Sequence, residues 1–215
     1  MTKKIVIPEA QELNFLSDIQ LVSAALDQQT KHQIADTVWP NSNYKGLCTV
    51  ATLYTANMLA LKYEVQENDY LARYTNPNEP VYSDSCVEFF IAFDDSGYYN
   101  FEFNANGACL AQFGTSKHNR EFILAADIRK IKMQKSFKQD QNGKLPYSWE
   151  LTILLPLQVF SHHQLQTLKG KHCKANFYKC GDDLAYPHFF CWNKVENREP
   201  NFHLPAYFGE LVFAS

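Results

Sequence analysis

Carboxylate and amide side chains alternate with apolar ones in segments 84–94 and 98–105, on either side of the turn residues Asp94 to Gly97. Alternation with a period of two, bounded by Asp, Ser and Gly, predicts a β-hairpin with one face in a core. Residues that pair across a hairpin point to the same face of the sheet. The two apolar sets therefore share a face only if the loop contains an odd number of residues. The opposite face then carries Asp84, Glu88, Asn100, Glu102 and Asn104. Such a face could hold a hydroxyl-rich ligand or a hard cation, and it is equally typical of a solvated sheet.

Paired carboxylates could also hydrolyse a glycoside. Asp84 and Glu88 are four residues apart on one strand, which separates them by about 13 Å at a rise of about 3.3 Å per residue. The carboxyl groups of glycosidases are only about 5 to 9.5 Å apart. Glu88 and Glu102 could lie closer together across the hairpin. A glycan hydrolase that uses Glu88 and Glu102 is therefore an alternative interpretation.

Two aromatic residues lie in loops beside strands. Tyr82 precedes the strand that begins near Asp84, and Phe202 precedes the last predicted strand. Aromatic rings can stack on the apolar faces of a pyranose while carboxylates and amides bind its hydroxyl groups. The same rings could instead close the open edge of a β-sandwich. The three tryptophans, Trp39, Trp149 and Trp192, lie in apolar segments and are predicted to belong to the core.

The remaining motifs exclude several kinds of site. No glycine-rich phosphate motif, HExxH or GxSxG is present. His162 and His163 are predicted to lie on a short helix, where neighbouring side chains point in different directions and do not share a zinc ion. Five basic residues lie between Arg129 and Lys138. We interpret them as a solvated strand face, with an anionic partner as the alternative.

Composition predicts a folded protein. The 215 residues are compatible with one domain, 1–215, and the 46% hydrophobic and 14% aromatic residues favour strands over disorder. The net charge of -3 gives no general attraction to nucleic acid or to an anionic membrane. No run approaches the roughly 18 apolar residues of a membrane span, and the first residues lack a signal peptide. We therefore expect a cytoplasmic protein with six reduced cysteines, or a secreted or periplasmic one if a leader was removed. The oligomeric state is unknown.

Hydrophobic periodicity predicts two minor helices and about eight to ten strands. The helices are expected at 17–28, capped by Ser17 and Gln20, and between Ser161 and Gly170. Strands are expected at 48–54, 58–65, 84–94, 98–105, 129–138, 149–155, 175–180, 189–195 and 209–213. Because strands and helices do not alternate, we predict an all-β antiparallel β-sandwich with one or two short helices.

Several motifs resemble the family 9 carbohydrate-binding modules. The segment DSCVEFFIAFD from Asp84 is similar to the DSVExFID strand of that family. Four other segments match in the expected order between about residues 32 and 213: Asp36 to Trp39, Trp149 to Pro156, FFCW around Trp192, and YFGELVF from Tyr207. The segments ANFYKCGD, PHFFCW and PNFHLPAYFG resemble a bacterial branch of family-nine-like proteins.

The resemblance implies an immunoglobulin- or DOMON-like sandwich that binds sugars without catalysis. Family members clamp a sugar between two tryptophans, whose positions correspond here to Tyr82 (or Val81) and Phe202. Glu88 matches the family's sugar-contacting glutamate, and Glu102 stands where an arginine is expected. Some members hold structural calcium, to which the turn at Asp94 and Asp95 could contribute.

The sequence therefore predicts non-catalytic saccharide binding. Tyr82 and Phe202 would clamp the ring, and Glu88, Asn100, Glu102 and Asn104 would bind its hydroxyl groups. The alternatives are the hydrolase and a sandwich that has lost sugar binding and holds a protein or another small ligand. No cofactor is certain, and calcium is the one that the resemblance allows.

Overall fold

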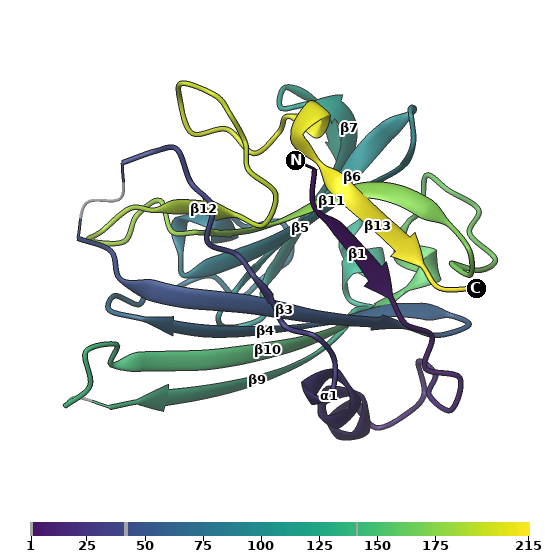
Figure 1. Ribbon diagram of the computed structural model, residues 1–215, viewed down its shortest axis with the longest axis horizontal. Helices are drawn as coiled ribbons and strands as arrows, with labels where there is room; N and C mark the ends of the chain where they lie inside the picture. Colours follow the sequence, from purple (N-terminus) through teal and green to yellow (C-terminus); the bar gives the residue numbers. More distant parts are fainter. Residues whose placement is uncertain (1, 41–42, 141) are drawn as a thin grey trace.

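Two β-sheets face each other in the computed structural model, which describes residues 2–40, 43–140 and 142–215 (Figure 1). The larger, eight-stranded sheet has the order β1-β13-β11-β5-β6-β7-β8, with β12 paired to β11. Its strands are β1 (Lys4–Ile7), β5 (Cys86–Asp94), β6 (Gly97–Asn104), β7 (Cys109–Ser116), β8 (Asn119–Phe122), β11 (His172–Cys180), β12 (Phe189–Cys191) and β13 (Gly209–Phe213). The five-stranded sheet has the order β2-β3-β4-β10-β9. Its strands are β2 (His32–Gln33), β3 (Gly46–Tyr54), β4 (Met58–Glu67), β9 (Lys132–Gln139) and β10 (Tyr147–Pro156).

The main core fills the space between the sheets. Odd-numbered residues of β5 and β6, such as Phe89 and Phe101, meet odd-numbered residues of β4 and β10, such as Leu61 and Ile153. All four side chains are fully buried, as period-two alternation predicts. Residues near both ends of the described chain, Ile5 and Phe213, belong to this same core. The predicted antiparallel sandwich is confirmed, with one parallel pair, β1 with β13.

The register of the central hairpin follows the predicted parity. Glu88 lies opposite Glu102 and Phe90 opposite Asn100, so both polar sets share the outer face of the eight-stranded sheet. The turn itself is tight, because Asp94 pairs with Gly97. Between Ile91 and Asp94 the register shifts, because β5 has one residue more than β6 there, as in a β-bulge. This extra residue gives the odd number that the parity requires.

The outer face of the eight-stranded sheet is covered around β5, β6 and the end of β11. Segment 181–208 folds back across it, and Phe202 and Phe208 pack on Phe90 and Tyr178 of the sheet in a second core cluster. Asn100 is fully buried on this face, and so are Asp84 and Asn104, which the loop before β5 contacts through Arg73 and Tyr74. The interpretation of these residues as an ordinary solvated face is therefore wrong. Period-two alternation identifies a face but not what covers it.

A helix covers one end of the other sheet's outer face. The helix α1 (Ile19–Asp27) places Val22 and Leu26 against Ala60 and Leu154. Asp18 caps it by accepting a hydrogen bond from the backbone N–H of Gln20. The predicted cap, Ser17, instead accepts from the N–H of Asn14.

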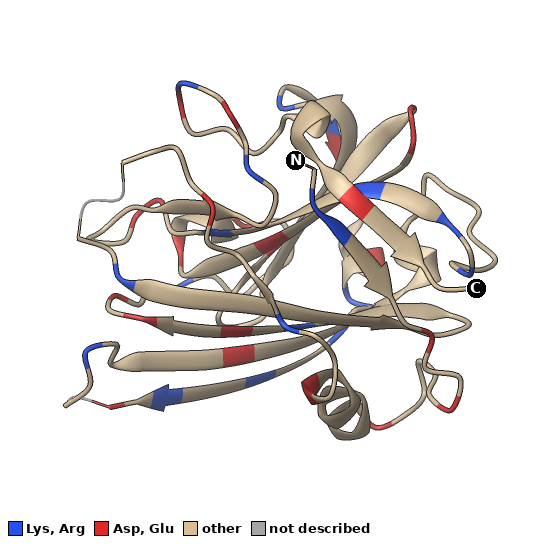
Figure 2. Cartoon of the chain, in the orientation of Figure 1, with Lys and Arg blue, Asp and Glu red and all other residues tan. Residues whose placement is uncertain are grey.

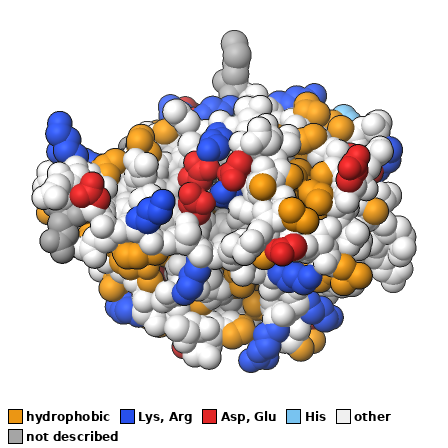
Figure 3. Space-filling view, turned by 90° about the horizontal axis from the view of Figure 1, so that it is seen from below, with side chains coloured by type: hydrophobic (Ala, Val, Ile, Leu, Met, Phe, Trp, Pro, Cys, Tyr) orange, Lys and Arg blue, Asp and Glu red, His pale blue; other side chains and the backbone are white. Residues whose placement is uncertain are grey.

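Ion pairs extend along the same face, where Lys62 contacts Asp27 and Glu150, and Lys31 contacts Glu64. Seen from below, acidic and basic side chains lie close together near the middle of the molecule (Figure 3). Acidic and basic residues are also intermingled along the rest of the chain (Figure 2). In the part of the chain that the structure describes, no helix is long and apolar enough to cross a membrane.

Several predicted elements need correction. The helix expected between Ser161 and Gly170 is absent from the described structure, where turns follow the short 3-10 helix Leu157–Val159. Tertiary contacts hold these turns, because the Tyr99 hydroxyl accepts from the N–H of His162 and lies 2.8 Å from Nδ1 of His163. Residues 129–131 follow the helix α2 (Ala125–Ile128) and precede β9, so the strand expected from Arg129 begins at Lys132.

Other strands were too short or too polar to be predicted from alternation. These are β1, β2, β7 and β8. The predicted strand 189–195 is only three residues long, as β12. The core positions of Trp39, Trp149 and Trp192 are confirmed, since each is at most 3% exposed.

Candidate functional site

A cavity of about 300 Å³ lies between the outer face of the eight-stranded sheet and the segment that covers it. The sheet contributes side chains from six strands, β5, β6, β7, β8, β11 and β12, and the loops around residues 82, 117, 182 and 200–203 form the sides and roof. The lining residues discussed below are Tyr82, Glu88, Glu102, Lys117, His118, Arg120, Cys180, Asp182, Phe202 and His203. Four of the six residues predicted from the sequence therefore line a single cavity: Tyr82, Glu88, Glu102 and Phe202.

Two buried carboxyl groups form the floor. Glu88 on β5 and Glu102 on β6 are direct cross-strand partners and are 3% and 4% exposed. Burial raises the pKa of Glu88 well above its usual value, and the nearby Cys180 and Glu102 raise it further. Burial also raises the pKa of Glu102 to about 7, although the Arg120 guanidinium acts in the opposite direction. At neutral pH the floor therefore offers carboxyl groups that can donate as well as accept hydrogen bonds.

A guanidinium group faces these carboxyl groups from β8. Nη1 of Arg120 donates to Oδ1 of Asn100 at 3.1 Å and lies 2.5 Å from Nδ1 of His203. Burial, followed by the positive charge of Arg120, lowers the pKa of His203 to about 2, so this ring is neutral and can accept. The Nδ2 group of Asn100 donates to Oε1 of Glu102 at 2.9 Å. Asn100 does not line the cavity, but it connects the carboxyl group to the guanidinium group and fixes both.

Two polar atoms at this site lack a partner among the described residues. They are Oε2 of Glu102 and Nε of Arg120, and both are buried. Since each of these two atoms lacks a partner within the described chain, they do not satisfy each other. Buried polar atoms almost always have hydrogen-bond partners. A ligand with a hydroxyl group could supply both partners, because a hydroxyl donates and accepts.

Charged residues surround the opening. Lys117 and His118 are exposed on the turn between β7 and β8, and Asp182, in the loop after β11, also lines the cavity. Burial and the neighbouring Asp183 raise the pKa of Asp182 to about 6. The opening therefore carries both signs of charge, which does not select strongly for an anionic or a cationic ligand.

The two predicted clamp residues present different surfaces. Tyr82, on the 3-10 helix Val81–Ser83, is 40% exposed beside the cavity. Phe202 is only 8% exposed, and one face of its ring stacks on Tyr178 with centroids 4.0 Å apart. Phe202 therefore has at most its other face and its edge available, whereas Tyr82 can turn a face toward a ligand.

Asn104 does not line the cavity. Its Nδ2 group donates to the Tyr74 carbonyl and to Asp84, and its Oδ1 accepts from the N–H groups of Asn106 and Ala108. Asp84 in turn accepts from the backbone and side chain of Arg73. These hydrogen bonds use the full capacity of the Asn104 amide. We therefore interpret Asn104 as a residue that shapes the loop before β5.

The turn at Asp94 and Asp95 has internal partners. Oδ1 of Asp94 accepts from the N–H and the hydroxyl of Ser96, and Oδ2 lies 3.3 Å from Nε2 of His163. Calcium requires six to eight oxygen ligands. A structural calcium ion at this turn stays a prediction.

Three residues that line the cavity were not predicted from the sequence: Arg120, His203 and Cys180. Arg120 lies in β8, a four-residue strand whose sequence NREF shows no clear alternation. His203 follows Phe202 in an irregular segment, and Cys180 is the last residue of β11. The one available signal was that Cys180 continues the period-two pattern of β11 on the face opposite Phe177.

Comparison with known proteins agrees with this architecture. The sequence profile of the family described as Carbohydrate-binding family 9 matches residues 19–213. A crystal structure of a candidate carbohydrate-binding protein from Bacteroides uniformis ATCC 8492 is 31% identical, with a TM-score of 0.89 over 99% of this chain and 100% of that chain. No curated protein sequence is significantly similar to this chain.

Two more distant structures share the fold. Both are family 9 carbohydrate-binding modules from Caldicellulosiruptor kristjanssonii. One, in complex with glucose, has a TM-score of 0.57 at 13% identity over 98% of this chain and 95% of that chain. The other, in complex with cellotriose, has a TM-score of 0.54 at 14% identity over 99% and 94%. From the profile match over most of its length, this chain belongs to carbohydrate-binding family 9.

Proposed function

We propose that this protein binds a saccharide, without catalysis, in the cavity over Glu88 and Glu102. The observation that carries the proposal is the pair of buried, unpartnered atoms, Oε2 of Glu102 and Nε of Arg120, at one cavity. A sugar presents neighbouring hydroxyl groups on a ring with apolar faces, which matches polar atoms in the floor and an aromatic ring at the side.

The residues have distinct roles in this proposal. Glu102 and Arg120 bind one hydroxyl group, and Glu88 binds a second. The exposed ring of Tyr82 stacks on one face of the sugar, and Phe202 contributes an apolar wall. Asn100 acts through Glu102 and Arg120 rather than by touching the ligand. The volume of about 300 Å³ is at the lower end for ligand sites, which favours one sugar unit, either free or at the end of a chain.

The family and the solved structures support the ligand class. The two modules from Caldicellulosiruptor kristjanssonii were solved with glucose and with cellotriose. Their low identity to this chain means that they support a saccharide ligand but do not identify which one.

Hydrolysis fits the same carboxyl groups less well. A retaining glycosidase requires one ionised carboxylate as nucleophile beside a protonated acid. Here burial raises the pKa of both Glu88 and Glu102, and the Arg120 guanidinium, which acts on Glu102, still leaves that pKa at about 7. Oε1 of Glu88 also accepts from the Cys180 thiol at 3.0 Å.

Calorimetric titration with a panel of mono- and disaccharides, after a glycan-array screen, tests the proposal. We expect at least one saccharide to bind to the wild-type chain and binding to weaken strongly in Glu102→Gln. Phe137→Ala, on the other sheet and 46% exposed, should bind like wild type. Absence of binding at millimolar saccharide by folded protein would refute the proposal, and turnover of a chromogenic glycoside that Glu88→Gln abolishes would favour the hydrolase.

A further inference from the structure

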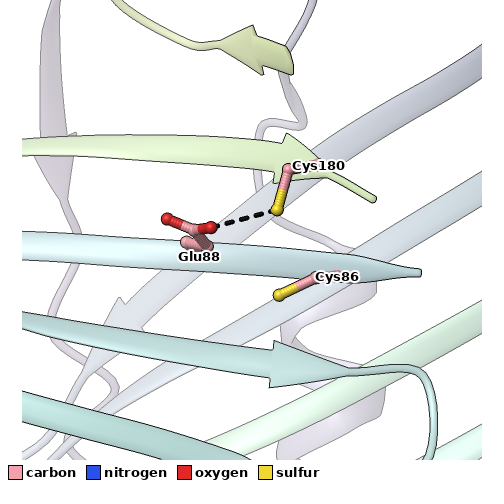
Figure 4. Close-up of side chains that lie close together, drawn as sticks. All are labelled: Cys86, Glu88 and Cys180. Carbon is pink, nitrogen blue, oxygen red and sulfur yellow. Dashed lines mark hydrogen bonds between the residues drawn. The ribbon is translucent and has the colours of Figure 1, made fainter. Parts of the chain in front are cut away.

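Two cysteines and a glutamate converge at the inner end of the cavity. Cys86 on β5 and Cys180 on β11 are direct cross-strand partners. Glu88 lies two residues beyond Cys86 on the same strand and therefore on the same face. In Figure 4 the two sulfur atoms and the carboxyl group point toward one another across the two strands.

The three side chains have the spacing of a metal site. One ligand atom from each residue lies within 4.8 Å of the others, and Sγ of Cys180 is 3.0 Å from Oε1 of Glu88. A tetrahedral zinc ion with Zn–S bonds of about 2.3 Å places its sulfur ligands roughly 3.8 Å apart. The ligand atoms would need to move by only about 1 Å or less to meet this geometry.

The surroundings distinguish this group from the other cysteines. Within residues 2–40, 43–140 and 142–215, it is the one group of three His, Cys, Asp or Glu side chains at such distances. Cys48, Cys109, Cys173 and Cys191 are buried free thiols outside it. The group is also accessible, because Glu88 and Cys180 line the cavity.

We propose that Cys86, Glu88 and Cys180 bind a thiophilic divalent cation, with zinc as the best fit. Two sulfur ligands select zinc over calcium or magnesium, and the carboxylate provides a third ligand. Because Glu88 and Cys180 line the cavity, water or a ligand hydroxyl group could provide the fourth ligand of a tetrahedral ion. The proposal goes beyond saccharide binding and does not depend on it.

Zinc binding must displace protons from these groups. Burial raises the pKa of Cys86 to about 12, with the hydrogen bond to Cys180 acting in the opposite direction. Burial also raises the pKa values of Cys180 and Glu88 well above their usual range. The ligands are therefore protonated without metal at neutral pH. Zinc affinity should rise with pH, and binding should release protons to the buffer.

Titration of the reduced full-length chain with Co²⁺, in the absence of saccharide, tests the proposal. All six cysteines are first confirmed as free thiols, and a phosphine reductant keeps them reduced. We expect one equivalent of Co²⁺ to produce a thiolate-to-cobalt charge-transfer band that Zn²⁺ abolishes. Cys86→Ser and Cys180→Ser should lose the band, whereas Cys173→Ser, on the same strand as Cys180, should keep it.

Glu88→Gln provides a second variant if the serine variants do not fold. It preserves the shape of the side chain and should weaken Zn²⁺ binding while retaining sulfur-to-cobalt absorption. Absence of the band in reduced wild-type protein, or a band of full intensity in folded Cys86→Ser and Cys180→Ser, would overturn the proposal. Because no saccharide is present, failure here is separate from failure of the saccharide proposal.

Discussion

Two buried polar clusters lie on opposite faces of the eight-stranded sheet, and they differ in how completely their hydrogen bonds are satisfied. Lys179 points between the sheets, and its three ammonium hydrogens have three acceptors: Glu67 at 3.0 Å, the Cys180 carbonyl at 2.9 Å and Nε2 of His188 at 2.7 Å. Glu67 also accepts from Trp149 at 2.7 Å and from Tyr44 at 3.1 Å. On the other face, the cavity leaves atoms of Glu102 and Arg120 without partners.

The difference separates a structural cluster from a binding site. His188 completes the closed cluster as a neutral ring, because burial and the Lys179 charge lower its pKa to about 2 and its Nδ1 lies 3.0 Å from the Tyr186 carbonyl. The ammonium group of Lys179 has no hydrogen left to donate to a ligand. The cavity, in contrast, gains hydrogen bonds when a ligand enters. Buried polar groups therefore indicate a site when they are incompletely paired, not merely when they are buried.

The largest expected effect comes from breaking the closed cluster. Lys179→Met leaves the fully buried Glu67 without its counter-charge. Removing one partner of a buried ion pair costs about 3–5 kcal/mol, so urea denaturation should show a decrease of that size in the free energy of unfolding. The double variant Lys179→Met/Glu67→Gln should recover part of it. A decrease below about 1 kcal/mol in the single variant would contradict the assignment of this cluster as structural.

The next effect concerns the dependence of stability on pH. Folding raises the pKa of Glu102 from 4.5 to about 7, so the folded protein holds a proton that the unfolded chain has already released between these pH values. The stability contributed by this group is full below about pH 4.5 and is lost as pH rises to about 7. Glu102→Gln should therefore be more stable relative to wild type at pH 8 than at pH 5, by up to about 3 kcal/mol. Equal differences at both pH values would show that Glu102 ionises normally.

Arg120 should affect binding more than stability. In Arg120→Gln, saccharide affinity should fall by roughly 10- to 100-fold, because a hydrogen bond to a charged group contributes about 1.5–3 kcal/mol. The free energy of unfolding should change by less than about 1 kcal/mol. Arg198→Gln, whose side chain is 94% exposed, is the control in the same calorimetric titration. Wild-type affinity in Arg120→Gln would remove the guanidinium group from the site.

The smallest expected effect is that of the aromatic side wall. Tyr82→Ala should reduce saccharide affinity about 2- to 10-fold, since ring stacking contributes about 0.5–1.5 kcal/mol. Phe137→Ala, which removes a comparably exposed ring from the other sheet, should leave affinity unchanged. Equal losses in the two variants would indicate nonspecific contacts with aromatic rings.

The sequence predicted the sandwich and the shared face of Glu88 and Glu102, because hydrophobic periodicity and hairpin parity are local properties. It did not predict that segment 181–208 covers this face and changes a solvated surface into a buried cavity. That arrangement depends on contacts such as Phe202 with Tyr178, which join residues distant along the chain and have no periodic signal.

The same limit applies to individual site residues. Arg120 reaches the cavity only because β8 pairs beside β7, and a four-residue strand is too short to predict from alternation. Asn104 shares the polar face as predicted, yet local hydrogen bonds to the loops around it use its amide completely. Phe202 lies at the cavity, but Tyr178 covers one of its faces. Sequence patterns thus identified the face of the sheet, and only the folded chain distinguishes its satisfied groups from its unsatisfied ones.

A crystal structure of the protein soaked with its best-binding saccharide tests the central claim most directly. We expect a sugar hydroxyl group within hydrogen-bond distance of both Oε2 of Glu102 and Nε of Arg120, with the ring against Tyr82. A saccharide bound elsewhere on the surface, with only water beside Glu102 and Arg120, would contradict the account.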